Sequence, residues 1–318
     1  MKLSIILCTR NRAHAVTGCL DSIAETLANA SVASADAEII VIDDRSRDST
    51  PSVLKEWAAR SAYPVRVLLG EVRGASAGRN QGMRSARGDL IALTDDDCRL
   101  DKNYVKDLLR HDAGDTELVL RGGRIAAGDP SDLQVTIKTS SERQRWHLRS
   151  APKTSSGFSG TISSCNMSLR RELLKTVGFF DEQFGPGTLL PAAEDTDFIV
   201  RAYLASVVVE YVPDMTVYHH HGRKSETEGK RLMRGYMVGT GGLCTKYLFK
   251  NPSLCRRDRS GAVDEAPANP HQRQAFDLSQ ADKLFHCGLG AVFYVFVRLR
   301  VLCGTGRPSW RNSRADLV

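Results

Sequence analysis

The sequence predicts an α/β protein built on a mainly parallel sheet with helices packed against its faces. Over roughly the first hundred residues, short apolar runs alternate with longer segments of helical spacing. The runs are rich in Ile, Val and Leu and lack polar alternation, which is typical of strands buried on both faces. With 318 residues, 42% of them hydrophobic and 25% charged, the chain is long enough to bury a substantial core.

The amino-terminal section is expected to contain four strands and three helices. The predicted strands are Leu3–Cys8, Glu38–Ile42, Val65–Leu69 and Leu90–Leu93. The predicted helices are His14–Ala30, Thr50–Arg60 and Ala75–Ala86. The apolar run of the first strand ends at Arg10 after about six residues, which is too short for the core of a signal peptide. Pro51 suits the first turn of the second helix, with Ser49 or Thr50 as its cap.

A second ordered section is expected beyond a long polar segment. Residues 127–160 are rich in Ser, Gly and Pro and show little periodicity, so they predict a long loop or a weakly structured insertion. The strands predicted after it are Ser163–Arg170, Val207–Val212 and Thr216–His220. The helices predicted after it are Arg171–Val177 and Glu194–Ala205.

The last third of the chain carries all of the basic excess. Residues 1–214 hold 27 Lys and Arg against 29 Asp and Glu, a balance of −2, whereas residues 215–318 hold 17 against 8, a balance of +9. A basic extension of this kind suits an anionic partner: nucleic acid, an anionic membrane surface or a phosphorylated ligand.

One apolar segment stands out in this basic extension. Leu284–Cys303 contains an uncharged run, Phe285–Val297, whose thirteen residues are too few to span a bilayer. Two interpretations remain open: a helix buried in the core, or a helix lying on an anionic membrane surface. Residues 234–250 form a second amphipathic candidate.

The cysteines give no sign of a zinc site or of a disulfide framework. All eight are scattered and none forms a CxxC pair. We therefore expect reduced thiols in a cytoplasmic protein.

Polar clusters follow the ends of three predicted strands. Ligands of parallel α/β sheets bind at the carboxyl ends of the strands, so these clusters should meet at one edge. The clusters are Thr9, Arg10 and Asn11; Asp43 and Asp44; and Asp95, Asp96 and Asp97.

The Asp95–Asp97 triplet raises the question of what offsets its own repulsion. It is either a solvated turn or a site for a hard divalent cation such as Mg²⁺ or Mn²⁺, which prefers oxygen ligands. Its position after a buried strand, facing the same edge as Asp43 and Asp44, favours the metal site.

Two further motifs contain groups that could take part in catalysis. Glu194 and Asp195 begin a predicted helix, where a carboxylate either stabilises the helix dipole or, kept ionised, serves as a general base. In the run His219–His221, alternation along a strand places His219 and His221 on one face.

These motifs together resemble the inverting glycosyltransferases of family 2, which have the GT-A fold. The resemblance covers residues 3–220 and rests on IILCTRNR, IIVIDDRSRDST, GRNQG, GDLIALTDDD, SCNMSLRR, GFFDEQFGPG and AAEDTDFIVRAYLA. It implies a nucleotide-diphosphate sugar donor, with Arg10 and Asp44 at the base, Arg79 in the donor region and Asp95 at the ribose. It further implies Asp97, with His219, as ligands of a Mn²⁺ or Mg²⁺ ion at the diphosphate. Asp195 would be the catalytic base and Glu194 its positioning neighbour.

The resemblance also implies how the chain is divided. Residues 1–221 would form the glycosyltransferase domain, with a nucleotide-binding half at 1–100 and an acceptor-binding half at 101–221 that includes the 127–160 loop. Residues 222–318 would form a basic, partly helical extension that could place a cytoplasmic enzyme on the inner face of the membrane.

Other classes fit the sequence less well. A dinucleotide-dependent oxidoreductase would carry GxGxxG after the first strand, where this chain has Thr9–Arg12. Two alternatives stay open: a nucleotidyltransferase that makes sugar nucleotides, and an inactive GT-A protein docked on a membrane. The expected acceptor is a saccharide, a lipid-linked sugar or a growing polysaccharide, and no nucleic acid partner is expected.

Overall fold

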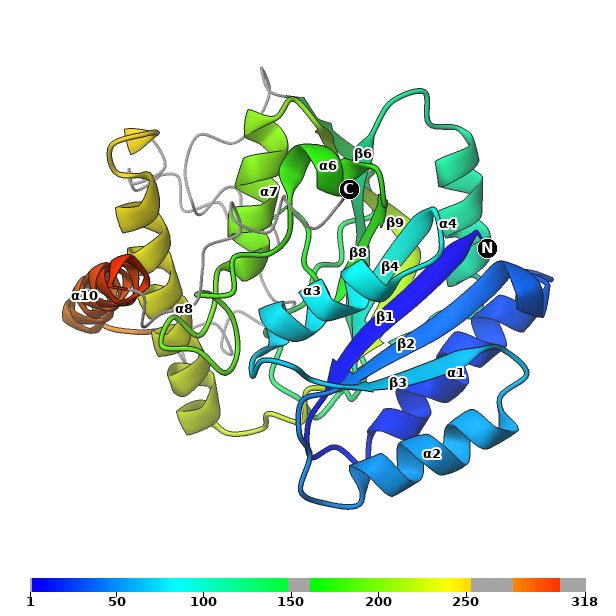
Figure 1. The fold of residues 1–318 in the computed structure, drawn as a ribbon. Coiled ribbons are helices and arrows are strands. Elements are labelled where there is room, and N and C mark those ends of the chain that lie inside the picture. Colours follow the sequence, from blue (N-terminus) through cyan, green and yellow to red (C-terminus); the bar gives the residue numbers. More distant parts are fainter. Residues whose placement is uncertain (1, 148–160, 253–276, 304–318) are drawn as a thin grey trace.

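The computed structural model describes residues 2–147, 161–252 and 277–303 (Figure 1). Four parallel strands form one side of a nine-stranded sheet. They are β1 (Leu3–Thr9), β2 (Ala37–Asp43), β3 (Val65–Leu69) and β4 (Leu90–Asp95). All four lie within one or two residues of the predicted strands, which confirms the mainly parallel α/β core.

The other side of the sheet mixes strand directions. The order of strands across the sheet is β3-β2-β1-β4-β8-β6-β9-β5, with β7 also paired to β9. β8 runs antiparallel to both β4 and β6, while β6 and β9 are parallel to each other. These strands are β5 (Cys98–Leu100), β6 (Val119–Ala127), β7 (Gln144–Trp146), β8 (Asn166–Arg170) and β9 (Val208–His219).

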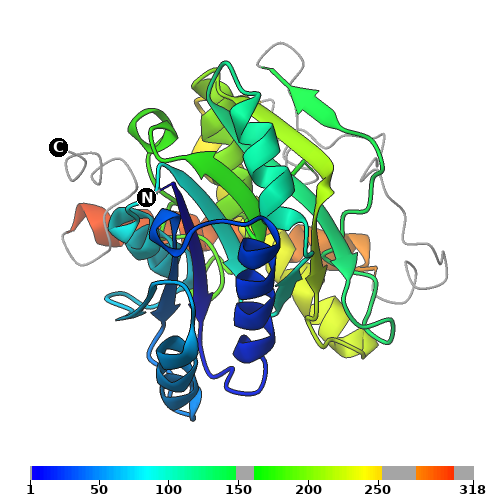
Figure 2. The ribbon, with the colours of Figure 1, turned by 90° about the vertical axis from the view of Figure 1, so that its right-hand side faces the viewer.

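Helices cover both faces of the sheet, and each face has its own core. Along β1, Ile5 and Leu7 join one core while Ile6 joins the other, as the alternation of a strand requires. The first core includes α1 (Val16–Asn29), α2 (Thr50–Arg60) and α4 (Tyr104–Ala113). The second includes α3 (Ala75–Ser85), α6 (Leu173–Val177), α7 (Glu194–Leu204) and α8 (Glu226–Tyr247). Figure 2 shows α1 in front of the sheet and α8 behind it.

In the second half of the sheet, one sequence prediction is wrong and another holds only in its alternative of a weakly structured insertion. Val207–Val212 and Thr216–His220 form one continuous strand, β9, whose register against β6 shifts between Gly123 and Arg124. A bulge of this kind accommodates Pro213, which has no N–H for the ladder. The segment predicted as a loop over 127–160 contains β7, which pairs antiparallel with β9. Its residues 148–160 lie outside the described part of the chain.

The apolar carboxyl-terminal segment forms α10 (Gln280–Leu302), which lies outside α8 (Figure 1). Only Gly290 is buried in this helix, so the interpretation as a buried core helix is wrong. The conclusion that this segment is too short to span a bilayer was also wrong, because the helix extends beyond the uncharged run and contains 23 residues. Among the described residues it is the one helix long and apolar enough to cross a membrane by length and composition.

Candidate functional site

The polar clusters predicted at the strand ends do meet at one edge of the sheet. β1 lies between β2 and β4, so Thr9 pairs with Asp43 and Cys8 pairs with Asp95. The parallel register therefore brings together residues that are dozens of positions apart in the sequence.

Arg10 and Asp44 lie next to each other at this edge. The Arg10 guanidinium is 3.9 Å from Asp44 Oδ2, which also accepts a hydrogen bond of 3.2 Å from the Gly74 N–H. Asp44 Oδ1 is buried and has no hydrogen-bond partner among the described residues, so it can accept a bond from a ligand. Asp43 and Asn11 stabilise the loops that follow the strands. Asp43 accepts a hydrogen bond of 2.9 Å from the Ser46 N–H, and Asn11 adopts a left-handed backbone with φ 53°.

The three aspartates at the end of β4 and directly after it point to three different partners. Asp95 binds Arg79 at 2.8 Å, Asp96 accepts a 2.6 Å hydrogen bond from the Thr9 hydroxyl, and Asp97 is 3.3 Å from His219. Protein groups thus offset much of the repulsion that the sequence had suggested a cation would relieve. Burial raises the pKa of Asp96 to about 6, although the hydrogen bond from Thr9 lowers it. Asp96 therefore has a structural role in the site, where it holds Thr9 in place.

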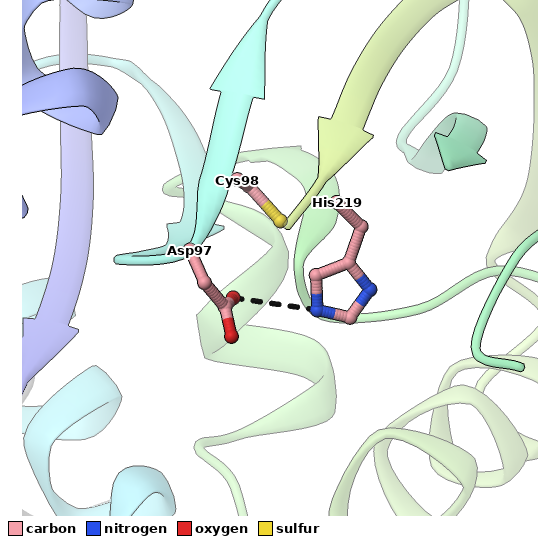
Figure 3. A group of neighbouring side chains, drawn as sticks. All are labelled: Asp97, Cys98 and His219. Atoms are coloured by element: carbon pink, nitrogen blue, oxygen red, sulfur yellow. Dashed lines mark ion pairs between the residues drawn. The ribbon is translucent and has the colours of Figure 1, made fainter. Parts of the chain in front are cut away.

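Asp97, Cys98 and His219 form a group in which the potential ligand atoms lie within 4.8 Å of one another (Figure 3). The antiparallel register of β5 and β9 creates it by pairing Cys98 with His219. Carboxylate oxygen and imidazole nitrogen fit a first-row divalent ion such as Mn²⁺. Cys98 does not fit a hard ion, because a hydrogen bond with Cys165 and burial hold its pKa well above the usual value and keep the thiol protonated.

Asp97 and His219 each stabilise the charged form of the other. Burial alone would raise the pKa of Asp97, but the hydrogen bond and charge of His219 and the charge of Arg12 lower it overall. Burial alone would lower the pKa of His219, but the bond to Asp97 and the nearby negative groups raise it to about 9. The second ring nitrogen, Nδ1, lies 3.1 Å from the Thr136 hydroxyl, which orients the ring.

Glu194 and Asp195 begin α7 and lie across the site from β4. The residue before them, Ala193, has a left-handed backbone with φ 77°, which turns the chain sharply into the helix. Asp195 Oδ2 accepts a hydrogen bond of 3.2 Å from the Ser163 hydroxyl, and its Oδ1 accepts one of 2.7 Å from the Thr196 N–H. Of the two carboxylates, Asp195 is the more accessible.

The two neighbouring carboxylates have raised pKa values. Burial and the charge of Asp195 raise the pKa of Glu194 to about 7, against the lowering effect of Arg79. Burial also raises the pKa of Asp195. A carboxylate with a raised pKa holds a proton more readily, which suits a group that must accept one during a reaction.

Arg79 connects the two halves of the site. Its buried guanidinium contacts Asp95 at 2.8 Å and Glu194 at 3.2 Å, and so joins the end of β4 to the start of α7. The sequence singled out all three residues and gave no sign that they would meet, because Arg79 and Glu194 are 115 positions apart.

Three other residues at the site were missed. Arg12 lies 3.8 Å from Asp96 and 3.5 Å from Asp97, Cys98 lies in the potential metal group, and Ser163 holds Asp195. Arg12 could have been found from its place in the loop after the first strand. Cys98 and Ser163 had no comparable signal, because only tertiary contacts bring them to the site.

The fold and the site define a GT-A-type α/β protein whose strand ends carry an ionic cluster. The sequence matches the model of the family described as glycosyl transferase family 2 over residues 4–178, more than half of the chain. The chain therefore belongs to glycosyl transferase family 2.

Named relatives are consistent with this membership. The chain is 25% identical over 244 residues to the poly(ribitol-phosphate) beta-N-acetylglucosaminyltransferase TarS of Staphylococcus aureus, with 74% of this chain and 38% of TarS covered. It is 22% identical over 239 residues to the glycosyltransferase AglE of Haloferax volcanii, with 75% and 72% covered. It spans only 60% of the length of EpsH of Bacillus subtilis, another relative at 26% identity.

Solved structures share the fold. TarS residues 1–349 in complex with UDP-GlcNAc superimpose with a TM-score of 0.55 at 20% identity, with 96% of this chain and 92% of that chain covered. The mannosyltransferase PcManGT from Pyrobaculum calidifontis, in complex with GDP-Man and Mn²⁺, gives a TM-score of 0.56 at 17% identity, with 94% and 75% covered.

Proposed function

We propose that this protein is a metal-dependent, inverting glycosyltransferase that moves a sugar from a nucleotide-diphosphate donor to a hydroxyl of a saccharide, lipid-linked or polysaccharide acceptor. The observation that carries the proposal is the bridge made by Arg79. It holds the edge at Asp95 and the carboxylate pair at Glu194 and Asp195 in one site, as a transfer between two substrates requires.

The nucleotide is assigned to the edge formed by β1, β2 and β4. Asp44 Oδ1, buried without a partner among the described residues, suits an N–H of the base, and Arg10 lies beside it. Arg79 and Asp95 lie further along the same edge, next to the position proposed for the ribose and the diphosphate. The ordered loop residues Thr9, Asn11 and Asp43, together with Asp96, would support this pocket.

Asp195 is assigned as the general base. It would take the proton from the acceptor hydroxyl, whose oxygen bonds to the anomeric carbon as the bond from that carbon to the diphosphate oxygen breaks. A single displacement of this kind inverts the configuration. Glu194, fixed by Arg79, would hold the substrate and the start of α7 in position.

Asp97 and His219 would hold the divalent ion, for which Mn²⁺ or Mg²⁺ are the candidates. His219 can be a ligand only in its neutral form, so the ion would replace the ring proton that now faces Asp97. When bound, such an ion supplies positive charge that stabilises the departing diphosphate more in the transition state than in the ground state. Arg12, at 3.5 Å from Asp97, is placed to add a second positive charge there.

We further propose that the enzyme works as a peripheral protein on an anionic membrane surface, with α10 as the contact. Large apolar side chains are exposed on this helix, and Lys283, Arg298 and Arg300 flank its uncharged run. The exposed apolar residues are Leu284, Phe285, Val292, Val295, Phe296, Leu299 and Leu302.

Vesicle binding tests this contact. Co-sedimentation with phosphatidylglycerol vesicles should exceed that with phosphatidylcholine vesicles, and Phe285→Ser should reduce it. Leu69→Ser is the matched control, because Leu69 on β3 has the same exposed fraction of 67%. Equal binding of all three proteins to both vesicles would contradict the membrane contact.

A ligand screen tests the enzymatic proposal. Thermal shifts with UDP, GDP, dTDP and their sugars, with and without Mn²⁺, should reveal one stabilising nucleotide whose effect grows with the metal. Hydrolysis of the matching sugar nucleotide should then depend on Mn²⁺. Binding without any transfer or hydrolysis would favour the alternative of an inactive GT-A protein, and synthesis of a sugar nucleotide from a nucleoside triphosphate would favour the nucleotidyltransferase.

A further inference from the structure

Helix α8 approaches the start of α7 unusually closely. Its Gly239 lies against the backbone of Ala192, where an added Cβ would be 2.6 Å from the carbonyl oxygen. Gly242 faces the Leu190 side chain in the same way, at 2.6 Å from an added Cβ. Glycine thus lets α8 pack directly against the segment that leads into Glu194.

The other end of the contact is ionic. Lys246, near the end of α8, lies 2.5 Å from Asp197 and 2.7 Å from Asp181. Its neighbour Tyr247 donates a hydrogen bond of 2.9 Å to Asp197 Oδ1. Asp197 is fully buried and lies in the first turn of α7, two residues after Asp195.

Asp197 is also tied into its own helix. Its backbone N–H donates a 2.9 Å bond to the Ala193 carbonyl, the first bond of the helix, and its Oδ2 accepts from Arg201 at 2.9 Å. Arg201 in turn donates at 2.7 Å to the carbonyl of Val177, at the end of α6. The contacts that α8 makes with Asp197 therefore hold in place the turn of α7 that carries Glu194 and Asp195.

We propose that α8 is a brace for the catalytic end of α7, and that Lys246 and Tyr247 are positioning residues for the Glu194–Asp195 pair. The inference rests on the proposed function insofar as Asp195 is the base. It assigns to the basic carboxyl-terminal part of the chain a role in catalysis that is separate from any contact with a membrane.

Hydrogen exchange on the full chain tests the brace without any substrate. In Lys246→Met, amides in residues 190–204 should exchange faster, while amides of β1 and β4 should keep their wild-type rates. Lys246→Arg should restore slow exchange, since it keeps the charge. The matched control is Lys230→Met, which removes a lysine from the same helix whose ion pair within the described part of the chain is with the exposed Glu226.

A steric pair of variants tests the brace by a second route. Gly239→Ala should loosen residues 190–204, because the new methyl group meets the Ala192 backbone. Gly288→Ala in α10 should have no such effect, because no atom of the residues that the structure describes outside this helix lies within 4 Å of the added Cβ. Tyr247→Phe loses one hydroxyl group and keeps the ring, so it remains informative if Lys246→Met does not fold.

Kinetics connect the brace to catalysis. Lys246→Met should lower kcat for Mn²⁺-dependent hydrolysis of the sugar nucleotide by about 10- to 100-fold, with KM for the donor little changed. Wild-type exchange and wild-type kcat in both Lys246→Met and Gly239→Ala would overturn the brace. If the wild type has no activity, the proposed function fails, but the exchange data still decide whether α8 braces α7.

Discussion

Asp97, after the end of β4, and the carboxylate pair at the start of α7 differ in how readily they hold a proton. At the end of β4, His219 and Arg12 keep the pKa of Asp97 below its usual value despite burial. At the start of α7, burial and the charge of Asp195 raise the pKa of Glu194 to about 7, and burial raises that of Asp195. The same residue types thus provide a permanent negative charge in one place and a proton acceptor in the other.

The difference teaches which part of the site does what. A carboxylate that stays ionised suits the binding of a cation, whereas one that titrates near neutral pH suits proton transfer. Arg79, between Asp95 and Glu194, keeps these two regions in contact. Substitutions at the start of α7 should therefore lower the rate of transfer, whereas substitutions at Asp97 should lower metal-dependent nucleotide binding.

The largest effect is expected from Asp195→Asn. The amide keeps the shape and cannot accept the proton, so transfer should fall by about 10²- to 10⁴-fold. Affinity for the nucleotide, measured by calorimetry, should remain. Transfer at the wild-type rate would show that the base lies elsewhere.

The pH dependence of the wild type should follow the α7 carboxylates. A base works in its ionised form, so activity is present above its pKa and lost below it. Burial raises the pKa of Asp195, the assigned base, so the rate should decline at a higher pH than an ordinary aspartate would give. The pKa of Glu194 is raised to about 7, and its protonation would weaken its bond to Arg79 and add to the decline below neutral pH. A loss of about tenfold per pH unit is expected on the acidic limb. A rate that stays flat down to pH 5 would separate these carboxylates from the chemistry.

Asp97→Ala should damage the other region. A residue that only hydrogen-bonds a metal ligand already contributes about 10- to 100-fold to metal affinity. The loss of Asp97, a direct ligand, should therefore weaken Mn²⁺-dependent nucleotide binding by at least that factor. Titrations with and without Mn²⁺ measure it. The metal-independent part of the affinity should survive, and unchanged dependence on Mn²⁺ would place the ion elsewhere.

Arg79→Lys should give the smallest and the most mixed effect. Lysine keeps the positive charge but cannot present the planar fork that reaches Asp95 and Glu194 together. We expect a loss of about tenfold, shared between donor affinity and rate, because one of the two contacts is given up. A loss confined to the rate would show that the nucleotide edge does not depend on the bridge.

The sequence was sufficient for elements whose signal is local. The bounds of α2, Thr50–Arg60, agree with its prediction because Pro51 marks the first turn, while Ser49 takes the N-cap position without a side-chain cap hydrogen bond. The strands that end at Thr9, Asp43 and Asp95 were found from their apolar runs. Local signals failed at Pro213, where a bulge lets one strand continue past a residue that usually ends it.

Sequence alone therefore determined the parallel core, the edge where Asp44 and Asp97 lie, and the residue types of the site. Periodicity and strand-end position encode these features within short segments. Tertiary structure decided which groups face each other: Arg79 with Glu194, Cys98 with His219, and Lys246 with Asp197. These pairs join distant parts of the chain, and their pKa directions follow from burial and neighbouring charge, which exist only after the chain has folded.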